Sequence, residues 1–77
     1  MVLTKEQARA LYEAMKNLND VEASFRFVVK HADGMNIVVE ENPETWAVSV
    51  KIDEGSTETI VEFYESQPAF AAAYSAS

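Results

Sequence analysis

The chain has 77 residues, of which 13 are Asp or Glu and six are Lys or Arg, so its net charge at pH 7 is −7. A chain of this length forms a single domain, residues 1–77, with a small hydrophobic core. The absence of cysteine excludes disulfides, thiolate metal sites and thiol catalysis. No apolar run approaches the ~20 residues of a membrane helix, and the start does not resemble a signal peptide, so we expect a cytoplasmic protein.

Residues 5–18 have the spacing of an amphipathic helix. Thr4 is a favourable N-cap, and Gln7 at the third helical position completes a capping box. Five apolar residues then recur at helical intervals: Ala8, Leu11, Tyr12, Met15 and Leu18. We expect this face to cover one side of a sheet, because a small sheet needs such a cover to bury its apolar residues.

Four later segments, 25–31, 35–40, 45–52 and 57–64, alternate apolar and polar residues with the period of a half-buried strand. The residues predicted on the buried face are Phe25, Phe27, Val29, His31, Met35, Ile37, Val39, Trp46, Val48, Val50, Ile52, Thr57, Thr59, Val61 and Phe63. The predicted fold is α+β, with an N-terminal helix, a four-stranded antiparallel meander in the order 1-2-3-4, and a short C-terminal helix.

The first hairpin has a register that its hydrophobic pattern predicts. A three-residue loop, Ala32-Asp33-Gly34, with Gly34 at positive φ, keeps the apolar faces together. This loop pairs Val29 with Ile37 and Phe27 with Val39. On the other face it pairs Arg26 with Glu40, which have opposite charges.

Two further turns follow from composition. Asn42-Pro43 favours a turn after the second strand, and pairing Glu40 with Thr45 brings Val39 opposite Trp46. A loop around Glu54-Gly55 pairs Ile52 with Thr57. That register places Trp46 opposite Phe63, and it places the opposite charges of Lys51 and Glu58 side by side.

The C-terminal segment allows two interpretations. In the first, Ser66 or Gln67 caps a short helix with Pro68 in its first turn, and Phe70, Ala73 and Tyr74 share a face. In the second, residues 57–67 form a helix capped by Ser56, and Pro68 ends it. The second interpretation gives the order helix, three strands, helix. We favour the first because Val61 and Phe63 complete the strand pattern.

The charge is concentrated in the second half of the chain. From Glu40 onwards there are eight acidic residues and one base, Lys51. The predicted register gathers five carboxylates at one corner of the sheet: Glu40, Glu41, Glu44, Glu62 and Glu65. Such an acidic corner could be a solvated cluster, a docking patch for a basic partner, or a site for a hard cation.

The sheet face opposite the predicted core carries apolar residues as well. Val28, Val38, Ile60 and Tyr64 form a strip there, together with Ala47. Exposed strips of this kind mark surfaces for partners or for self-association. The alternative is that the C-terminal helix covers the strip.

The sequence contains no recognisable catalytic or cofactor-binding motif. His31 is the only histidine, and it lacks the nucleophile and orienting carboxylate of a general-base pair. No Gly-rich phosphate loop, nucleophile elbow or zinc-protease motif is present. We therefore expect no enzyme activity, no cofactor and no metal ligand set.

These observations favour a small acidic protein-binding module, an adaptor or an inhibitor, acting through the open sheet face and the acidic corner. Its partner would be another protein with a basic surface, and it would bind neither nucleic acid nor a membrane directly. One alternative is a DNA-mimic inhibitor of a nucleic-acid-binding protein, of the type that phages encode. Another is a homodimeric structural subunit joined through the open face.

Overall fold

The computed structural model describes residues 1–31 and 34–76. The elements in chain order are α1 (Lys5–Leu18), the single-turn 3-10 helix η1 (Asn19–Val21), β1 (Arg26–Lys30), β2 (Asn36–Glu41), β3 (Val48–Asp53), β4 (Glu58–Tyr64) and α2 (Gln67–Ala76). The strands form one antiparallel sheet in the order β1-β2-β3-β4. The predicted α+β fold is therefore confirmed, and the three-strand alternative is wrong because 58–64 is extended.

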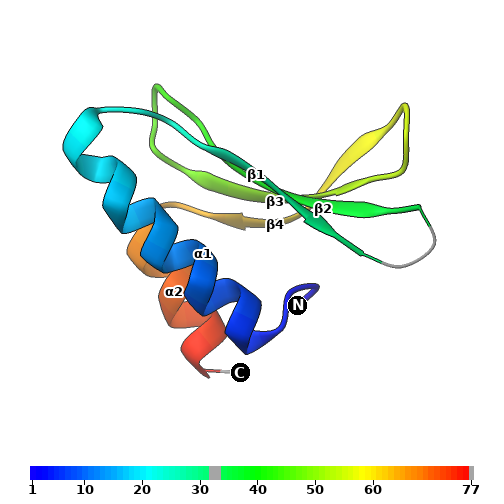
Figure 1. Cartoon of the computed structure of the whole chain (residues 1–77), viewed down its shortest axis with the longest axis horizontal. Coiled ribbons are helices and arrows are strands. Elements are labelled where there is room, and N and C mark those ends of the chain that lie inside the picture. The colour runs from blue at the N-terminus through cyan, green and yellow to red at the C-terminus, as the bar shows by residue number, and fades with distance from the viewer. Residues whose placement is uncertain (32–33, 77) are drawn as a thin grey trace.

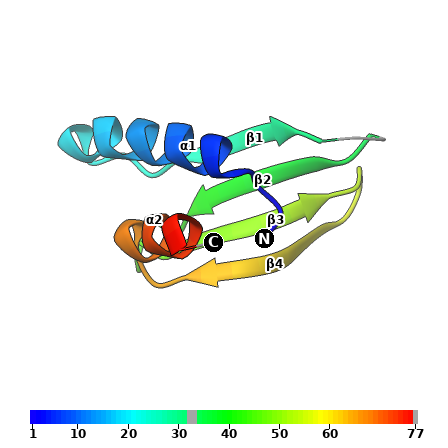
Figure 2. The ribbon, with the colours of Figure 1, turned by 90° about the horizontal axis from the view of Figure 1, so that it is seen from below.

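The molecule has two layers, a sheet and a pair of helices on one of its faces (Figure 1). Seen from the helix side, α1 lies towards β1 and α2 towards β4 (Figure 2). The two helices also pack against each other. The core between the layers consists of Leu3, Ala8, Met15, Phe25, Ile37, Val39, Val48, Val50, Phe70 and Tyr74. Neither helix covers the other face of the sheet.

Both helices begin where the sequence predicts. The hydroxyl of Thr4 accepts a hydrogen bond from the Gln7 N–H (3.0 Å), and the Gln7 side chain accepts one from the Thr4 N–H (2.9 Å). In α2, the hydroxyl of Ser66 accepts one from the Ala69 N–H (3.2 Å). Neither α1 nor α2, as far as the chain is described, is long and apolar enough to cross a membrane.

The first hairpin has the predicted register, with Val29 opposite Ile37 and Arg26 opposite Glu40. The His31 N–H donates to the Met35 carbonyl (3.0 Å), and Gly34 has the predicted positive φ of 76°. The other two predicted loop residues, 32 and 33, lie outside the described residues. The hydrophobic pattern was sufficient here because only one loop length keeps both apolar faces together.

The predicted register of the second hairpin is wrong. Val39 lies opposite Val50 rather than Trp46, and Glu41 lies opposite Val48. The turn starts at Asn42, whose side-chain oxygen accepts from the N–H groups of Glu44 (2.8 Å) and Thr45 (3.2 Å). With this capping the loop spans residues 42–47, whereas the predicted pairing of Glu40 with Thr45 leaves a loop at 41–44. Trp46 therefore belongs to the turn and not to a strand.

The predicted register of the third hairpin is also wrong. Ile52 lies opposite Thr59, and a β-bulge at Val61 shifts the pairing between Val50 and Lys51. A bulge adds one residue to a strand and reverses the faces of every residue beyond it. Tyr64 consequently lies on the helix side, whereas Phe63 lies on the open side. Both are the reverse of the prediction.

Candidate docking surface

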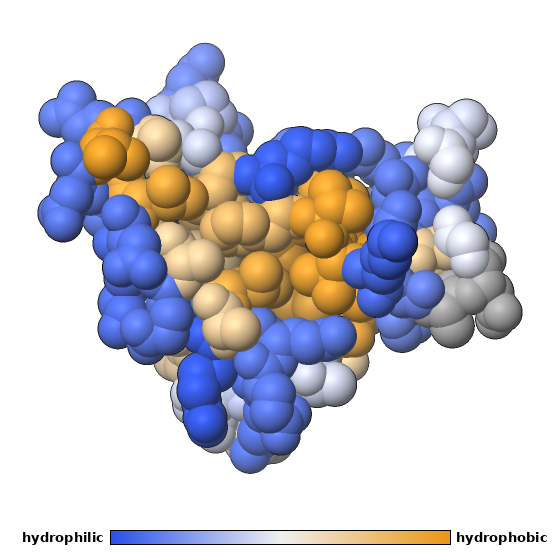
Figure 3. All heavy atoms as spheres, viewed as in Figure 1, coloured by the Kyte–Doolittle hydropathy of each residue, from blue (hydrophilic) through white to orange (hydrophobic). Residues whose placement is uncertain are grey.

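The open face of the sheet carries large apolar side chains on its two edge strands. Val28 on β1 is 57% exposed, and Ile60 and Phe63 on β4 are 55% and 60% exposed. The turns at 42–47 and 54–57 rise at opposite ends of the sheet, on the side away from the helices (Figure 1). In the space-filling view of Figure 3 they form two projections with a depression between them. The open face is thus concave and partly apolar.

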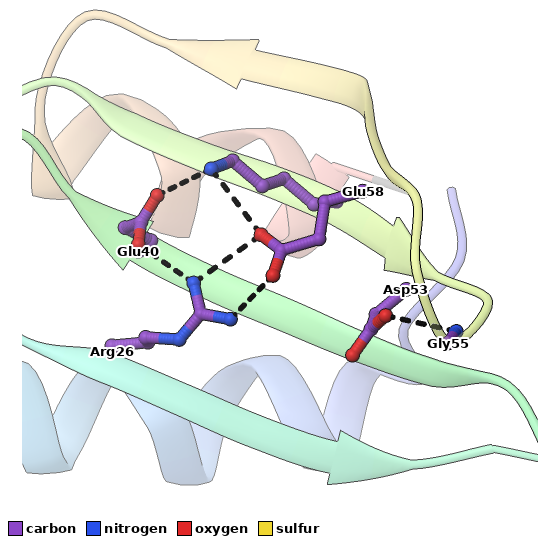
Figure 4. A network of polar contacts seen from close by, with 6 residues as sticks. Arg26, Glu40, Asp53, Gly55 and Glu58 are labelled. Atoms are coloured by element: carbon purple, nitrogen blue, oxygen red, sulfur yellow. Dashed lines mark hydrogen bonds and ion pairs between the residues drawn. The ribbon is translucent and has the colours of Figure 1, made fainter.

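Four charged side chains form an alternating network across this face. The Arg26 guanidinium bonds to Glu40 (2.8 Å) and to Glu58 (2.7 Å). The Lys51 ammonium contacts the same two carboxylates, Glu40 at 2.5 Å and Glu58 at 3.6 Å. Figure 4 shows Arg26 reaching from β1 across the sheet to Glu58 on β4. The predicted pairs Arg26–Glu40 and Lys51–Glu58 are both present, although the register behind the second was wrong.

The network shifts the titration of each of its members. Hydrogen bonding to Lys51, and then to Arg26, lowers the pKa of Glu40, and bonding to Arg26 lowers the pKa of Glu58. Hydrogen bonding to Glu40 raises the pKa of Lys51. The four groups stay charged near neutral pH and neutralise one another. The side chains remain 20–44% exposed, so water and salt screen their attraction.

Val38 occupies the middle of this face and is nevertheless fully buried. It lies between Val28 and Lys51 in the sheet, two residues from Glu40 on β2, and Arg26 on β1 bonds to Glu58 on β4 across the same face. The aliphatic stems of Arg and Lys shield apolar surface while their charged ends stay in water. Of the predicted strip, Val28 and Ile60 are exposed on the open face, Val38 is buried there, and Tyr64 lies on the helix side.

The predicted acidic corner is divided between the two faces of the sheet. Glu40 belongs to the open-face network, whereas Glu41 is buried on the helix side, where it accepts a hydrogen bond from Gln67 (2.8 Å). Glu62 also lies on the helix side. Glu44 and Glu65 are exposed in the turn after β2 and in the link to α2. The bulge in β4 and the longer second turn separate groups that the predicted register brings together.

Glu62 joins three segments that are distant in sequence. One carboxylate oxygen accepts from the hydroxyls of Tyr64 and Tyr74 (both 2.6 Å), and the other accepts from the Val2 N–H (2.8 Å). Partial burial acts to raise the pKa of Glu62, but these hydrogen bonds outweigh it and hold the pKa below its usual value. Burial and the same carboxylate raise the pKa of both tyrosines. Glu62 is therefore a structural residue.

The described residues do not form a site for a metal ion. Among residues 1–31 and 34–76, no three His, Asp or Glu side chains come together as ligands. His31 is exposed just beyond the end of β1. In the part of the chain described, the residues of the predicted acidic corner therefore provide no set of ligands for a cation.

A second apolar surface lies between α1 and β1 on the side of the molecule that faces the viewer in Figure 3. Leu11 and Leu18 of α1 and Phe27 and Val29 of β1 are only half-buried, although all four pack against the core. Beside them β1 forms an edge of the sheet, because among residues 1–31 and 34–76 it pairs with β2 alone.

Sequence reasoning missed two exposed aromatic residues. Phe63 and Trp46 are 60% and 51% exposed, whereas the alternation pattern places both in the core. The signal for Trp46 was its position four residues after Asn42, at the end of a turn. Phe63 gave no such signal, since nothing in the local sequence marks the bulge.

Comparisons with known proteins identify no relative: no family model matches the chain, and neither does any curated protein or solved structure.

Proposed function

We propose that this chain is a non-enzymatic protein-binding module that docks a basic partner protein in the concave open face of its sheet. The observation that carries the proposal is the exposure of Val28, Ile60 and Phe63 on a face that neither helix covers. Large apolar side chains left exposed on an uncovered sheet face are a common mark of a protein interface.

The charges of the face suit docking. Arg26, Lys51, Glu40 and Glu58 neutralise one another, so covering them would not bury an unpaired charge. At the two ends of the face the raised turns carry exposed carboxylates, Glu44 in one and Glu54 in the other. A partner with apolar residues flanked by Lys or Arg would match this arrangement.

The net charge favours a basic partner over a second copy. Two copies carry −7 each and repel, whereas a basic protein is attracted from a distance. DNA mimicry, the alternative, needs unpaired carboxylates spread over one surface. Glu40 and Glu58 are ion-paired, Glu41 and Glu62 are hydrogen-bonded on the helix side, and Asp53 accepts from the Gly55 N–H, so five of the eight acids of the second half are engaged internally.

The test compares capture by three forms of the chain. A Val28→Glu/Ile60→Glu double variant changes only exposed side chains of the open face. Ala72→Glu, an exposed position on α2, is the matched control. We expect a host protein that is retained by the wild type and by Ala72→Glu, lost with the double variant, and released as salt is raised.

Retention by the double variant would contradict the proposal. Sedimentation of the purified chain tests separately whether a second copy of the chain, and not another protein, covers the open face. A monomer has a mass of 8.6 kDa, and a mass twice that value in the wild type, restored to monomer by the double variant, would assign the face to a second copy instead.

A further inference from the structure

A hollow at one end of the molecule lies between η1, the turn at 42–47 and the start of α2. Its volume is about 430 Å³, and its lining residues are Asn19, Glu22, Ala23, Glu41, Trp46, Ser66, Gln67 and Pro68. The lining includes two carboxylates and no lysine or arginine. This hollow is separate from the open face, and a ligand bound in it does not require a partner on the sheet.

Trp46 forms an aromatic wall of the hollow. The Trp46 N–H donates to the Asn42 carbonyl (2.8 Å), and the chain leaves the turn with Trp46 at a φ of 64°. A bulky residue seldom adopts this left-handed conformation, which costs of order 1–3 kcal/mol. The residue is nevertheless half exposed and lies outside the core cluster, so burial of the indole in the core does not offset that cost.

Glu41 supplies a carboxylate to the same hollow. The residue is only 4% exposed, and its Oε2 accepts a hydrogen bond from Gln67 Nε2 (2.8 Å). Within the part of the chain described, Oε1 accepts none, yet no fully buried side-chain oxygen there lacks a partner. Oε1 must therefore reach solvent, and the hollow is the space that Glu41 borders.

The pattern of backbone strain points to the same place. Among the described residues, the two non-glycine residues with positive φ are Trp46 and Glu22 (φ 51°), and both line the hollow. Strained residues concentrate at ligand sites, where the surrounding structure holds them in place. Around the hollow, the amides of Asn19 and Gln67 bond to each other (3.1 and 3.2 Å), which fixes the Gln67 side chain that holds Glu41.

We propose that this hollow binds the guanidinium group of an arginine side chain presented by a basic protein. A guanidinium stacks on an aromatic ring and donates paired hydrogen bonds to a carboxylate, and Trp46 and Glu41 offer these two groups. Glu22 adds a second negative charge at the rim. Since none of the lining residues is cationic, an arriving guanidinium meets no like charge there.

Trp46 makes the test direct, because it is the only tryptophan in the chain and its fluorescence reports on the hollow alone. The probe is the tripeptide acetyl-Gly-Arg-Gly-amide, and the control is the same peptide with citrulline, the neutral isostere of arginine. We expect a saturable fluorescence change with the arginine peptide and at least tenfold weaker binding of the citrulline peptide. Equal binding of the two peptides would overturn the proposal.

A matched pair of variants separates the carboxylate from the overall charge. Glu41→Gln keeps a side-chain oxygen for Gln67 and should weaken binding of the arginine peptide at least tenfold. Glu65→Gln removes an exposed acid outside the hollow and should leave binding unchanged. If Glu41→Gln fails to fold by circular dichroism, Glu22→Gln replaces it and should weaken binding severalfold. The proposal would be overturned if Glu65→Gln weakened binding of the arginine peptide as much as the hollow variants do, or if the hollow variants did not weaken it. Neither outcome depends on the result of the open-face experiment.

Discussion

At the scale of single residues, Val38 shows how charged side chains can complete a core. It points to the open face of the sheet, where no helix lies, yet it is fully buried. Val28 is its neighbour on the same face and remains 57% exposed. Val38 lies on the inner strand β2 and Val28 on the edge strand β1, and we attribute the burial of Val38 to the flanking strands together with the network of Arg26, Glu40, Lys51 and Glu58, which crosses this face (Figure 4).

This contrast makes Val38→Ala and Val28→Ala a matched pair. Removing the two γ-methyl groups of Val38 leaves a cavity, and the free energy of unfolding should fall by about 1–3 kcal/mol. The same change at Val28 should cost within about 0.5 kcal/mol because its methyl groups already lie in water. Urea denaturation at pH 7 measures both. Equal losses would show that the network does not shield Val38.

At the scale of elements, α2 is a helix whose residues Gln67–Ala76 include no charged side chain. Its stability depends on packing and on its N-cap. Phe70 and Tyr74 are buried, and their rings contact each other and the ring of Tyr64 at centroid distances of 5.2–6.4 Å. Ser66 satisfies one of the free N–H groups of the first turn.

Ser66→Ala should therefore lower the free energy of unfolding by about 1 kcal/mol, the usual cost of losing such a cap. Ser75→Ala is the control, since Ser75 is exposed near the other end of the same helix, and it should change stability by less than about 0.5 kcal/mol. Thermal unfolding followed by circular dichroism distinguishes the two. A negligible effect of Ser66→Ala would mean that packing alone holds the helix.

At the scale of the whole molecule, Glu62 connects the two ends of the chain to the sheet. Its carboxylate holds the N–H of Val2, the hydroxyl of Tyr64 on β4 and the hydroxyl of Tyr74 on α2. Its pKa in the folded protein lies below the ordinary value of 4.5. The stabilisation is therefore present above pH 4.5 and is lost as the pH falls through the lower, folded-state pKa.

Glu62→Gln should lower the free energy of unfolding by about 1–3 kcal/mol at pH 7, since charge-assisted hydrogen bonds are replaced by neutral ones. It should also weaken the pH dependence of that free energy between pH 5 and about pH 3. Part of the dependence should remain, because the pKa values of Glu40 and Glu58 are lowered as well. Urea titrations across this range provide the measurement. An unchanged pH profile in Glu62→Gln, with Glu65→Gln as control, would contradict the assignment.

Features that depend on a few neighbouring residues could be read from the sequence. The caps at Thr4 and Ser66, the two helices, the four strands and the first hairpin all depend on contacts within a short stretch of chain. Alternation also showed that Val28 and Ile60 belong to the face away from the core. Each of these inferences needs only the period of the element and the chemistry of one turn.

The sequence by itself therefore determined the number, type and order of the elements, and the tertiary structure decided how β2, β3 and β4 align. A different turn length or a bulge leaves the alternation unchanged but moves every later residue to a new partner or a new face. The bulge at Val61 moved Tyr64 and Glu62 to the helices and Phe63 to the open face, and the capped turn at Asn42 put Trp46 beside Glu41. These choices depend on contacts across the whole sheet and with both helices, and no local pattern records them.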